Sequence, residues 1–146
     1  MGGYPSRGLR TIDHLYIRNY QPDWWPAGTG EEGETNLPNQ WFADCDGGPT
    51  KDYLFEHREK DDAHRRAFAL CFGKRPAEEL YRLADDPGQV RNLATDPDEF
   101  ETLERLRATL QQRLTELGDP RAANPTTLEF DGHPYYGGGG KRPKRN

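Results

Sequence analysis

Three side chains of types that often bind metals recur at seven-residue intervals: His57, His64 and Cys71. On one continuous helix, seven residues span about 10.5 Å, whereas the ligands of one zinc ion lie within a few ångströms of each other. Helical ligand pairs are spaced four residues apart, as in H-E-x-x-H. The spacing therefore indicates ordinary residues on a helix surface, and we expect no shared metal.

Other patterns that could support catalysis are equally incomplete. Acidic residues come in close pairs, but none lies in the roughly 12-residue loop of alternating oxygen ligands that binds calcium in EF-hands. Asp85-Asp86-Pro87-Gly88 is typical of a turn. The only serine, Ser6, is outside any G-x-S-x-G elbow. The glycines at 137–140 lack the lysine and flanking elements of a phosphate-binding loop. We therefore expect no self-contained catalytic apparatus. The acidic pairs are Asp44/Asp46, Asp61/Asp62 and Asp85/Asp86.

The composition of the 146 residues limits the fold class. Only 32% are hydrophobic, and three Val or Ile residues are too few for the buried strands of a large parallel sheet. A complete α/β enzyme is therefore excluded. The 7 Tyr, 6 Phe and 3 Trp argue against a disordered chain. A small α+β unit that packs against something larger is the remaining interpretation.

Charge and hydropathy exclude further classes. The net charge of −5 includes four basic residues among the last six, so the rest of the chain is strongly acidic. We therefore do not expect general binding to nucleic acids. We expect no membrane span, because no apolar stretch approaches ~20 residues. No signal peptide is recognisable, and the sequence does not fix a compartment. Cys45 and Cys71 could form one disulfide or remain separate thiols.

Periodicity and turn residues predict the elements that would position any site. The strongest is a helix over 96–117, with Asp96 as N-cap, Glu99 completing a capping box and Gly118 ending it. A leucine stripe at helical spacing should pack on a small antiparallel sheet. Thr50 is expected to cap the first of the shorter helices. The stripe comprises Phe100, Leu103, Leu106, Leu110, Leu114 and Leu117. The other expected elements are a β-hairpin over 6–20 turning at Asp13-His14, a Trp/Pro/Gly-rich loop over 21–50, helices within 51–72 and a strand over 77–83.

Separate blocks of the sequence, in the order that the family has them, resemble the C-terminal region of the sulfatase family. Residues 73–94 contain Glu79-Leu80-Tyr81-Arg82-Leu83, Asp86-Pro87 and Asn92-Leu93-Ala94, similar to the family's E-L-Y-D-L, D-P and N-L-A signature. Residues 4–20 resemble its "Y-P-x-R…R-T…Y-I-R-N" strand pair. The resemblance covers about residues 4–118 and is strongest to bacterial relatives of heparan N-sulfatase. It implies that 1–120 form the C-terminal subdomain of an alkaline-phosphatase-like sulfatase fold, followed by an irregular, Gly-rich basic tail over 121–146. Leu80 and Leu83 should then face the covered side of the sheet, with Tyr81 opposite.

The resemblance also implies what this chain lacks. Sulfatases use a formylglycine, made from the first residue of C/S-x-P-x-R, together with a calcium ion. Full-length members of the family are usually exported. Cys45 precedes Asp-Gly-Gly-Pro and Cys71 precedes Phe-Gly-Lys-Arg, so neither cysteine matches. We expect the chain to carry no cofactor and to be inactive by itself. Its expected partner is the missing catalytic domain, in cis or as a separate chain.

An arginine of the hairpin and the tryptophans of the following loop are the candidate substrate contacts that the resemblance suggests. Arg7 matches the arginine of Y-P-x-R and could bind sulfate or carboxylate oxygens of a sulfated sugar, or it could tie the hairpin to the main domain through a buried ion pair. Trp24 and Trp25, with Trp41, could stack on a sugar ring or fill a gap between subdomains. The alternative function is a non-enzymatic interaction module that retains this fold.

Overall fold

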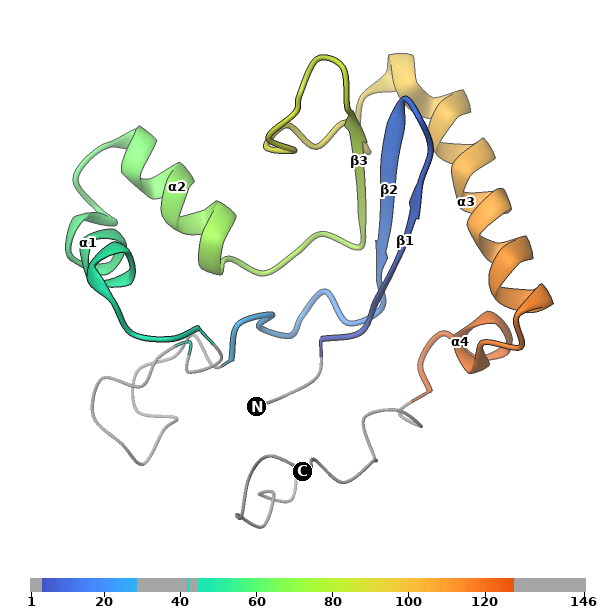
Figure 1. The fold of residues 1–146 in the computed structure, drawn as a ribbon, viewed down its shortest axis with the longest axis horizontal. Helices are drawn as coiled ribbons and strands as arrows, with labels where there is room; N and C mark the ends of the chain where they lie inside the picture. The colour runs from blue at the N-terminus through green and yellow to red at the C-terminus, as the bar shows by residue number, and fades with distance from the viewer. Residues whose placement is uncertain (1–3, 29–41, 43–44, 128–146) are drawn as a thin grey trace, which may run out of the picture.

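The fold is α+β, as predicted (Figure 1). The structure is a computed structural model that describes residues 4–28, 42 and 45–127. Its strands form one antiparallel sheet in the order β1-β2-β3. No helix in these ranges is long and apolar enough to cross a membrane. The elements are β1 (Ser6–Arg10), β2 (His14–Asn19), α1 (Pro49–His57), α2 (Asp62–Phe72), β3 (Glu78–Arg82), the 3-10 turn η1 (Pro97–Glu99), α3 (Phe100–Glu116) and α4 (Pro120–Ala123).

The hairpin forms where the sequence predicts it, with its turn at Thr11–Asp13 rather than at Asp13-His14. Thr11–Asp13 connect the strands, and His14 already belongs to β2 rather than to the turn. The Thr11 hydroxyl oxygen accepts a hydrogen bond from the His14 backbone N–H at 2.9 Å. Threonine and serine hydroxyls often replace a backbone acceptor in this way, and here the Thr11 hydroxyl closes the loop just before the predicted start of β2.

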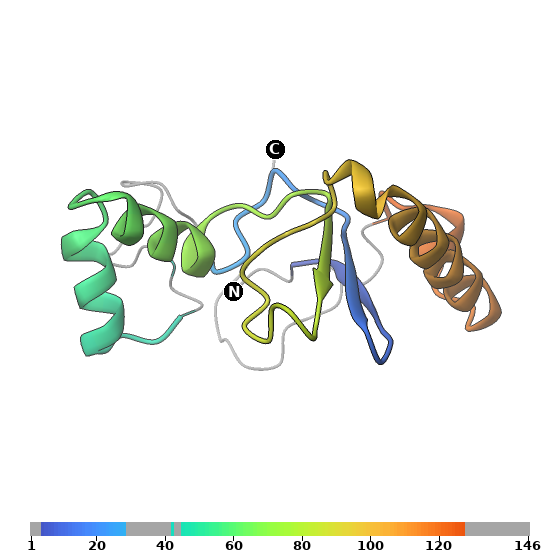
Figure 2. The same ribbon diagram turned by 90° about the horizontal axis from the view of Figure 1, so that it is seen from above.

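One face of the sheet packs against α3, which runs along it in Figures 1 and 2. The middle of the leucine stripe is buried as predicted, and it meets Tyr16, Leu80 and Leu93 in one hydrophobic core. The buried stripe residues are Leu103, Leu106, Leu110 and Leu114.

The prediction that both ends of the leucine stripe are buried is wrong. Phe100 is 61% exposed and Leu117 is 80% exposed, although both fit the helical spacing of the stripe. Gly118, at φ +68°, ends the helix as expected. Leu83 does not share the covered face with Leu80, because it lies beyond β3 and three positions away, whereas strand faces repeat every two residues.

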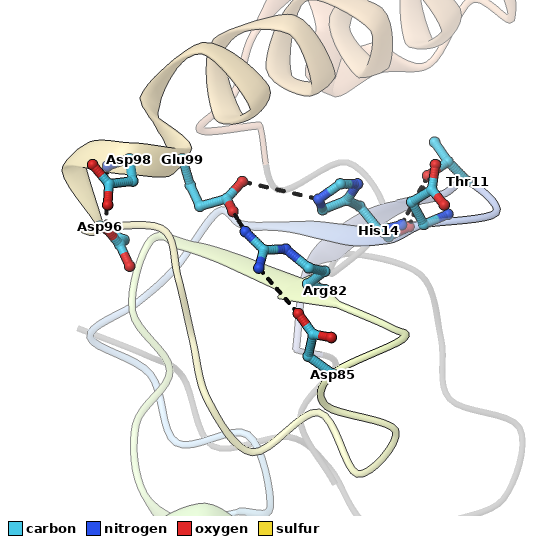
Figure 3. A network of polar contacts seen from close by, with 8 residues as sticks. Thr11, His14, Arg82, Asp85, Asp96, Asp98 and Glu99 are labelled. Atoms are coloured by element: carbon cyan, nitrogen blue, oxygen red, sulfur yellow. Dashed lines mark hydrogen bonds and ion pairs between the residues drawn. The ribbon is translucent and has the colours of Figure 1, made fainter.

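The start of the terminal helix is capped differently from the prediction. Asp96 is the N-cap, but its side chain accepts from the Asp98 backbone N–H at the head of η1. Glu99 does not close a capping box. Its carboxylate, 5% exposed as a residue, accepts a hydrogen bond from Arg82 of β3 and lies 3.9 Å from Nε2 of His14 (Figure 3). Glu99 therefore joins the helix to the sheet.

Helices α1 and α2 form a pair on the opposite side of the sheet from α3 (Figures 1 and 2). Their contact is aromatic, since Phe55, Phe68 and Phe72 surround Phe42 with ring centroids 5.0–6.0 Å from its own. The first helix starts at Pro49 with Gly48 as N-cap, so Thr50 lies inside it rather than capping it. Proline is well suited to the first turn of a helix because its missing N–H has no partner there anyway.

The ordered fold continues past residue 120. The short helix α4 follows Asp119, whose side chain accepts from the Arg121 backbone N–H at 2.9 Å. Arg121 is 1% exposed. The expectation of an irregular chain from residue 121 is therefore wrong for 121–123, because capping and burial order this short segment. The basic end of the predicted tail lies outside the described residues.

Candidate functional site

Arg7 anchors the hairpin to the C-terminal turn of the described chain. Its Nε donates to Oδ2 of Asp119 at 2.7 Å, and its Nη1 donates to the Ser6 carbonyl at 2.8 Å. Both members of the Arg7–Asp119 pair are largely covered, with side chains 27% and 14% exposed. This geometry matches the ion-pair alternative for Arg7, although the partner belongs to this chain rather than to another domain. A role in substrate contact stays a prediction.

Tyr20, just after β2, lies between two further arginines. The guanidinium carbons of Arg18 and Arg121 are 5.2 Å and 5.3 Å from its ring centroid, within the range of a cation–π contact. Burial raises the pKa of the Tyr20 hydroxyl, with the nearby arginines opposing the shift. The hydroxyl oxygen is itself buried, and it has no hydrogen-bond partner within the described part of the chain.

A third ionic group closes the same end of the sheet. Arg107 of α3 reaches Glu78 of β3 with two hydrogen bonds, Nε to Oε1 at 2.7 Å and Nη2 to Oε2 at 2.6 Å. The Tyr16 hydroxyl also donates to Glu78. The Arg107 hydrogen bonds favour the ionised form of the Glu78 carboxyl, whereas burial disfavours it. The hydrogen bonds have the larger effect and hold the pKa of this carboxyl below its usual range.

These groups border a cavity of about 340 Å³. It lies where β2 ends and β3 begins, and it is bordered by Arg107 of α3 and by residues that follow α4. Its walls include Arg18, Tyr20, Glu78, Arg107 and Thr126. We call this hollow the Arg18 cavity. Sequence reasoning missed it, although Arg18-Asn19-Tyr20 is part of the block that carries the family resemblance.

Trp25 lies with the helical pair rather than at the Arg18 cavity. Trp25 contacts Phe42 edge-on at 5.5 Å, and the Lys74 ammonium lies 5.0 Å from the Trp25 ring centroid. Trp24 is half-buried, and its backbone N–H donates to the Gln21 carbonyl at 3.0 Å. Trp41 lies outside the described residues. The structure thus separates Trp25 from Arg7, and sugar stacking by these tryptophans stays a prediction.

The histidines require a correction to the metal argument. His57 belongs to α1 and His64 to α2, so the distance along a single helix does not apply to them. Their ring centroids are 5.9 Å apart, and the Tyr53 ring stacks on His57 at 4.2 Å. Within the described ranges, no group of three or more His, Cys, Asp or Glu side chains is arranged to hold a metal ion. Cys45 and Cys71 are unpaired thiols.

Comparison with known proteins supports the family resemblance. No family model matches the chain. Two curated relatives match, each named an ulvan-active sulfatase from Formosa agariphila: one is 29% identical over 113 residues, or 77% of this chain, and the other 31% identical over 121 residues, or 83%. This chain is related to the sulfatases.

The relationship covers most of this chain but little of those sulfatases. The matched segments are 17% and 19% of the two relatives. The narrower resemblance to heparan N-sulfatase is not specifically supported by these matches, which concern ulvan-active proteins. The sulfatase relationship therefore concerns most of this chain, and the activity of a whole sulfatase is a separate question.

Proposed function

We propose that this chain serves as the C-terminal subdomain of a sulfatase whose catalytic part lies outside these residues. The observation that carries the proposal is the size of the match, since 83% of this chain corresponds to 19% of a curated sulfatase. The sheet and α3 would support the catalytic part, and the arginine-rich end of the sheet would form an edge of the substrate cleft.

The chain by itself is proposed to be inactive. Hydrolysis of a sulfate ester requires a nucleophile and an electrophilic group in one site, and the 146 residues contain no C/S-x-P-x-R motif. The calcium ion of the family does not fit the described residues either. These residues contain no group of three or more His, Cys, Asp or Glu side chains that could hold a metal ion, and the carboxylates of Glu78 and Asp119 are bonded to Arg107 and Arg7.

Sulfated glycans are the proposed substrate class of the complete enzyme. The names of the two curated relatives support a sulfated polysaccharide. The residue blocks at 4–20 and 73–94 support, as the finer assignment, a heparan N-sulfatase-like member that cleaves sulfamates or sulfate esters.

A segment exchange tests the proposal. The segment of the 31%-identical ulvan-active sulfatase that matches this chain is replaced by the corresponding residues of this chain. We expect a soluble protein that retains sulfatase activity on ulvan, because the exchanged unit brings its own core. The same enzyme with the segment deleted is the control and should be insoluble or inactive.

Two results would contradict the proposal. One is an exchanged enzyme that is no better than the deletion, which would favour the interaction-module alternative. The other is turnover of an aryl sulfate by this chain alone, with contaminating enzyme excluded.

A further inference from the structure

We propose that His57 and His64 together bind a late first-row divalent cation such as Zn²⁺, through the Nε2 atom of each imidazole, with water completing the coordination. The inference does not depend on the proposed function. The expectation of no shared metal applied to one continuous helix, whereas His57 ends α1 and His64 lies in the first turn of α2. The short connection between these helices brings the two imidazoles together (Figure 1).

Hydrogen bonds select which nitrogen of each ring carries the proton. Nδ1 of His57 lies 3.0 Å from the Tyr53 carbonyl oxygen, which can only accept, so this nitrogen is the donor. Nδ1 of His64 lies 2.6 Å from Oδ1 of Asp61, and this carboxylate also accepts. In each neutral ring the other nitrogen, Nε2, therefore carries a lone pair. Histidines that bind metals have this same arrangement, with the second nitrogen donating to a carboxylate or a backbone carbonyl.

The separation of the two rings fits one shared cation. Zinc lies about 2.0–2.1 Å from a histidine nitrogen, so two imidazoles on one tetrahedral ion should have ring centroids about 5 Å apart. The observed separation of the His57 and His64 centroids is 5.9 Å, and the ring planes differ by 30°. A small rotation of either side chain is enough to bring both rings to the coordinating distance.

Tyr53 supports both histidines and leaves them open to solvent. Its ring stacks on His57 with centroids 4.2 Å apart, and its hydroxyl oxygen lies 3.1 Å from Nε2 of His64. Because this Nε2 is an acceptor, the hydroxyl is the donor, and a cation bound to Nε2 would displace that hydrogen bond. The His64 side chain is 20% exposed and Tyr53 is 48% exposed, so a hydrated ion can reach the pair.

The two imidazoles favour a late transition metal over calcium or magnesium. Imidazole nitrogen suits Zn²⁺, Cu²⁺ and Ni²⁺, whereas Ca²⁺ and Mg²⁺ take oxygen ligands. Two protein ligands are fewer than the three or four of typical zinc sites, so we expect a weaker affinity than theirs. Because the ligands belong to different helices, the bound ion should stabilise the α1–α2 pair against unfolding.

Titration of the 146-residue chain with zinc chloride, followed by NMR of the histidine side chains, tests the proposal. The pH and ionic strength are held constant in a buffer that does not bind zinc. We expect saturable shifts of the His57 and His64 ring signals with one common midpoint, and magnesium chloride should cause none. His57→Gln and His64→Gln should each weaken binding at least about tenfold, since loss of even an outer-shell partner of a metal ligand costs about 10–100-fold.

Two control variants separate this site from other metal-binding side chains. His14→Gln removes a histidine of the sheet, and Cys71→Ser removes a thiol from the far end of α2. Both should bind zinc with the affinity of the unmodified chain. An affinity that falls with either control as much as with His57→Gln would overturn the proposal, because zinc would then be held elsewhere.

Tyr53→Phe keeps the stacked ring and removes only the hydroxyl that occupies Nε2 of His64. It should bind zinc at least as tightly as the unmodified chain, and it gives a second result if a glutamine variant does not fold. The proposal is overturned if zinc causes no saturable shift at His57 and His64, if the two rings respond with different midpoints, or if both glutamine variants bind zinc unchanged. Weaker binding by Tyr53→Phe would contradict the assignment of Nε2 of His64 as a ligand that competes with this hydroxyl.

Discussion

The side-chain oxygen of Asn92 accepts a hydrogen bond from the backbone N–H of Leu80 at 2.8 Å. The Asn92 amide nitrogen donates to the Glu78 carbonyl at 3.0 Å, and the Leu93 N–H donates to the Leu80 carbonyl at 2.8 Å. Because β3 is an edge strand, its outer backbone groups would otherwise face solvent without a neighbouring strand. The Asn-Leu-Ala of the family resemblance thus closes the sheet edge with Asn92 and fills the core with Leu93.

Replacing Asn92 with alanine should therefore lower the free energy of unfolding. Both β3 backbone groups lose their partner, and we expect a loss of about 1–3 kcal/mol. Urea unfolding followed by circular dichroism measures it. Arg91→Ala is the matched control, because the Arg91 side chain is 74% exposed and its ion pair with Asp96 is long, at 3.9 Å. It should change stability by no more than about 0.5 kcal/mol. Equal losses for the two variants would refute the role of Asn92.

Glu99→Ala should destabilise the junction between the terminal helix and the sheet. It removes a buried carboxylate and leaves Arg82 and His14 without their shared partner. Arg82 is partly solvated and keeps Asp85 as a second acceptor at 3.0 Å, so we expect a moderate loss of about 1–3 kcal/mol. Glu101→Ala, two positions along on an exposed part of α3, should be nearly neutral. A neutral Glu99→Ala in the same unfolding assay would mean that Glu99 does not join helix to sheet.

Local sequence patterns predicted the helices and strands, but they could not predict the polar contacts between these elements. The spacing of Leu103, Leu106 and Leu110 defines a helix face whatever the helix packs on. The position of Glu99 looked like a capping box because local sequence does not reveal that Arg82, 17 residues earlier, offers a cation. Tertiary contact overrides the local preference there.

The candidate site shows the same limit at longer range. Arg7 meets Asp119 across 112 residues, and Tyr20 meets Arg121 from α4, a helix that no periodicity predicted. Four residues are too few to show a helical repeat. The family resemblance did select Arg7 as a residue of interest and included Arg18 in its quoted block.

Acid should weaken the fold in part through Glu78. The Arg107 hydrogen bonds lower the pKa of this carboxyl in the folded state from the ordinary value of 4.5. A lowered folded-state pKa adds stability above the ordinary value, and this contribution is lost as the pH falls through the folded-state pKa. Arg107→Gln should therefore be less stable than the unmodified chain near neutral pH, and the difference should shrink below a pH of about 4.5.

Urea unfolding at a series of pH values from about 7 down to about 3 measures that difference. Arg105→Gln is the control, because Arg105 is an exposed arginine of the same helix without an acidic partner among the described residues. Its difference from the unmodified chain should be small and independent of pH. A difference for Arg107→Gln that stays constant on acidification would assign the loss to packing rather than to the Glu78 carboxylate.

Leu110→Ala tests the packing of α3 on the sheet. Leu110 is 5% exposed in the middle of the buried stripe, and removing its side chain should leave a cavity and cost about 2–5 kcal/mol. Gln112→Ala is the control on the exposed side of the helix, where the side chain bonds only Glu116, and it should stay within about 0.5 kcal/mol. The adjacent Gln111 would be a poor control, since its amide donates to the Ala122 carbonyl at 3.0 Å and ties α3 to α4. If the chain is too unstable for a reliable transition, the same variants can be compared in the exchanged sulfatase by thermal unfolding. Leu110→Ala no worse than Gln112→Ala there would show that α3 does not pack on the sheet through this face.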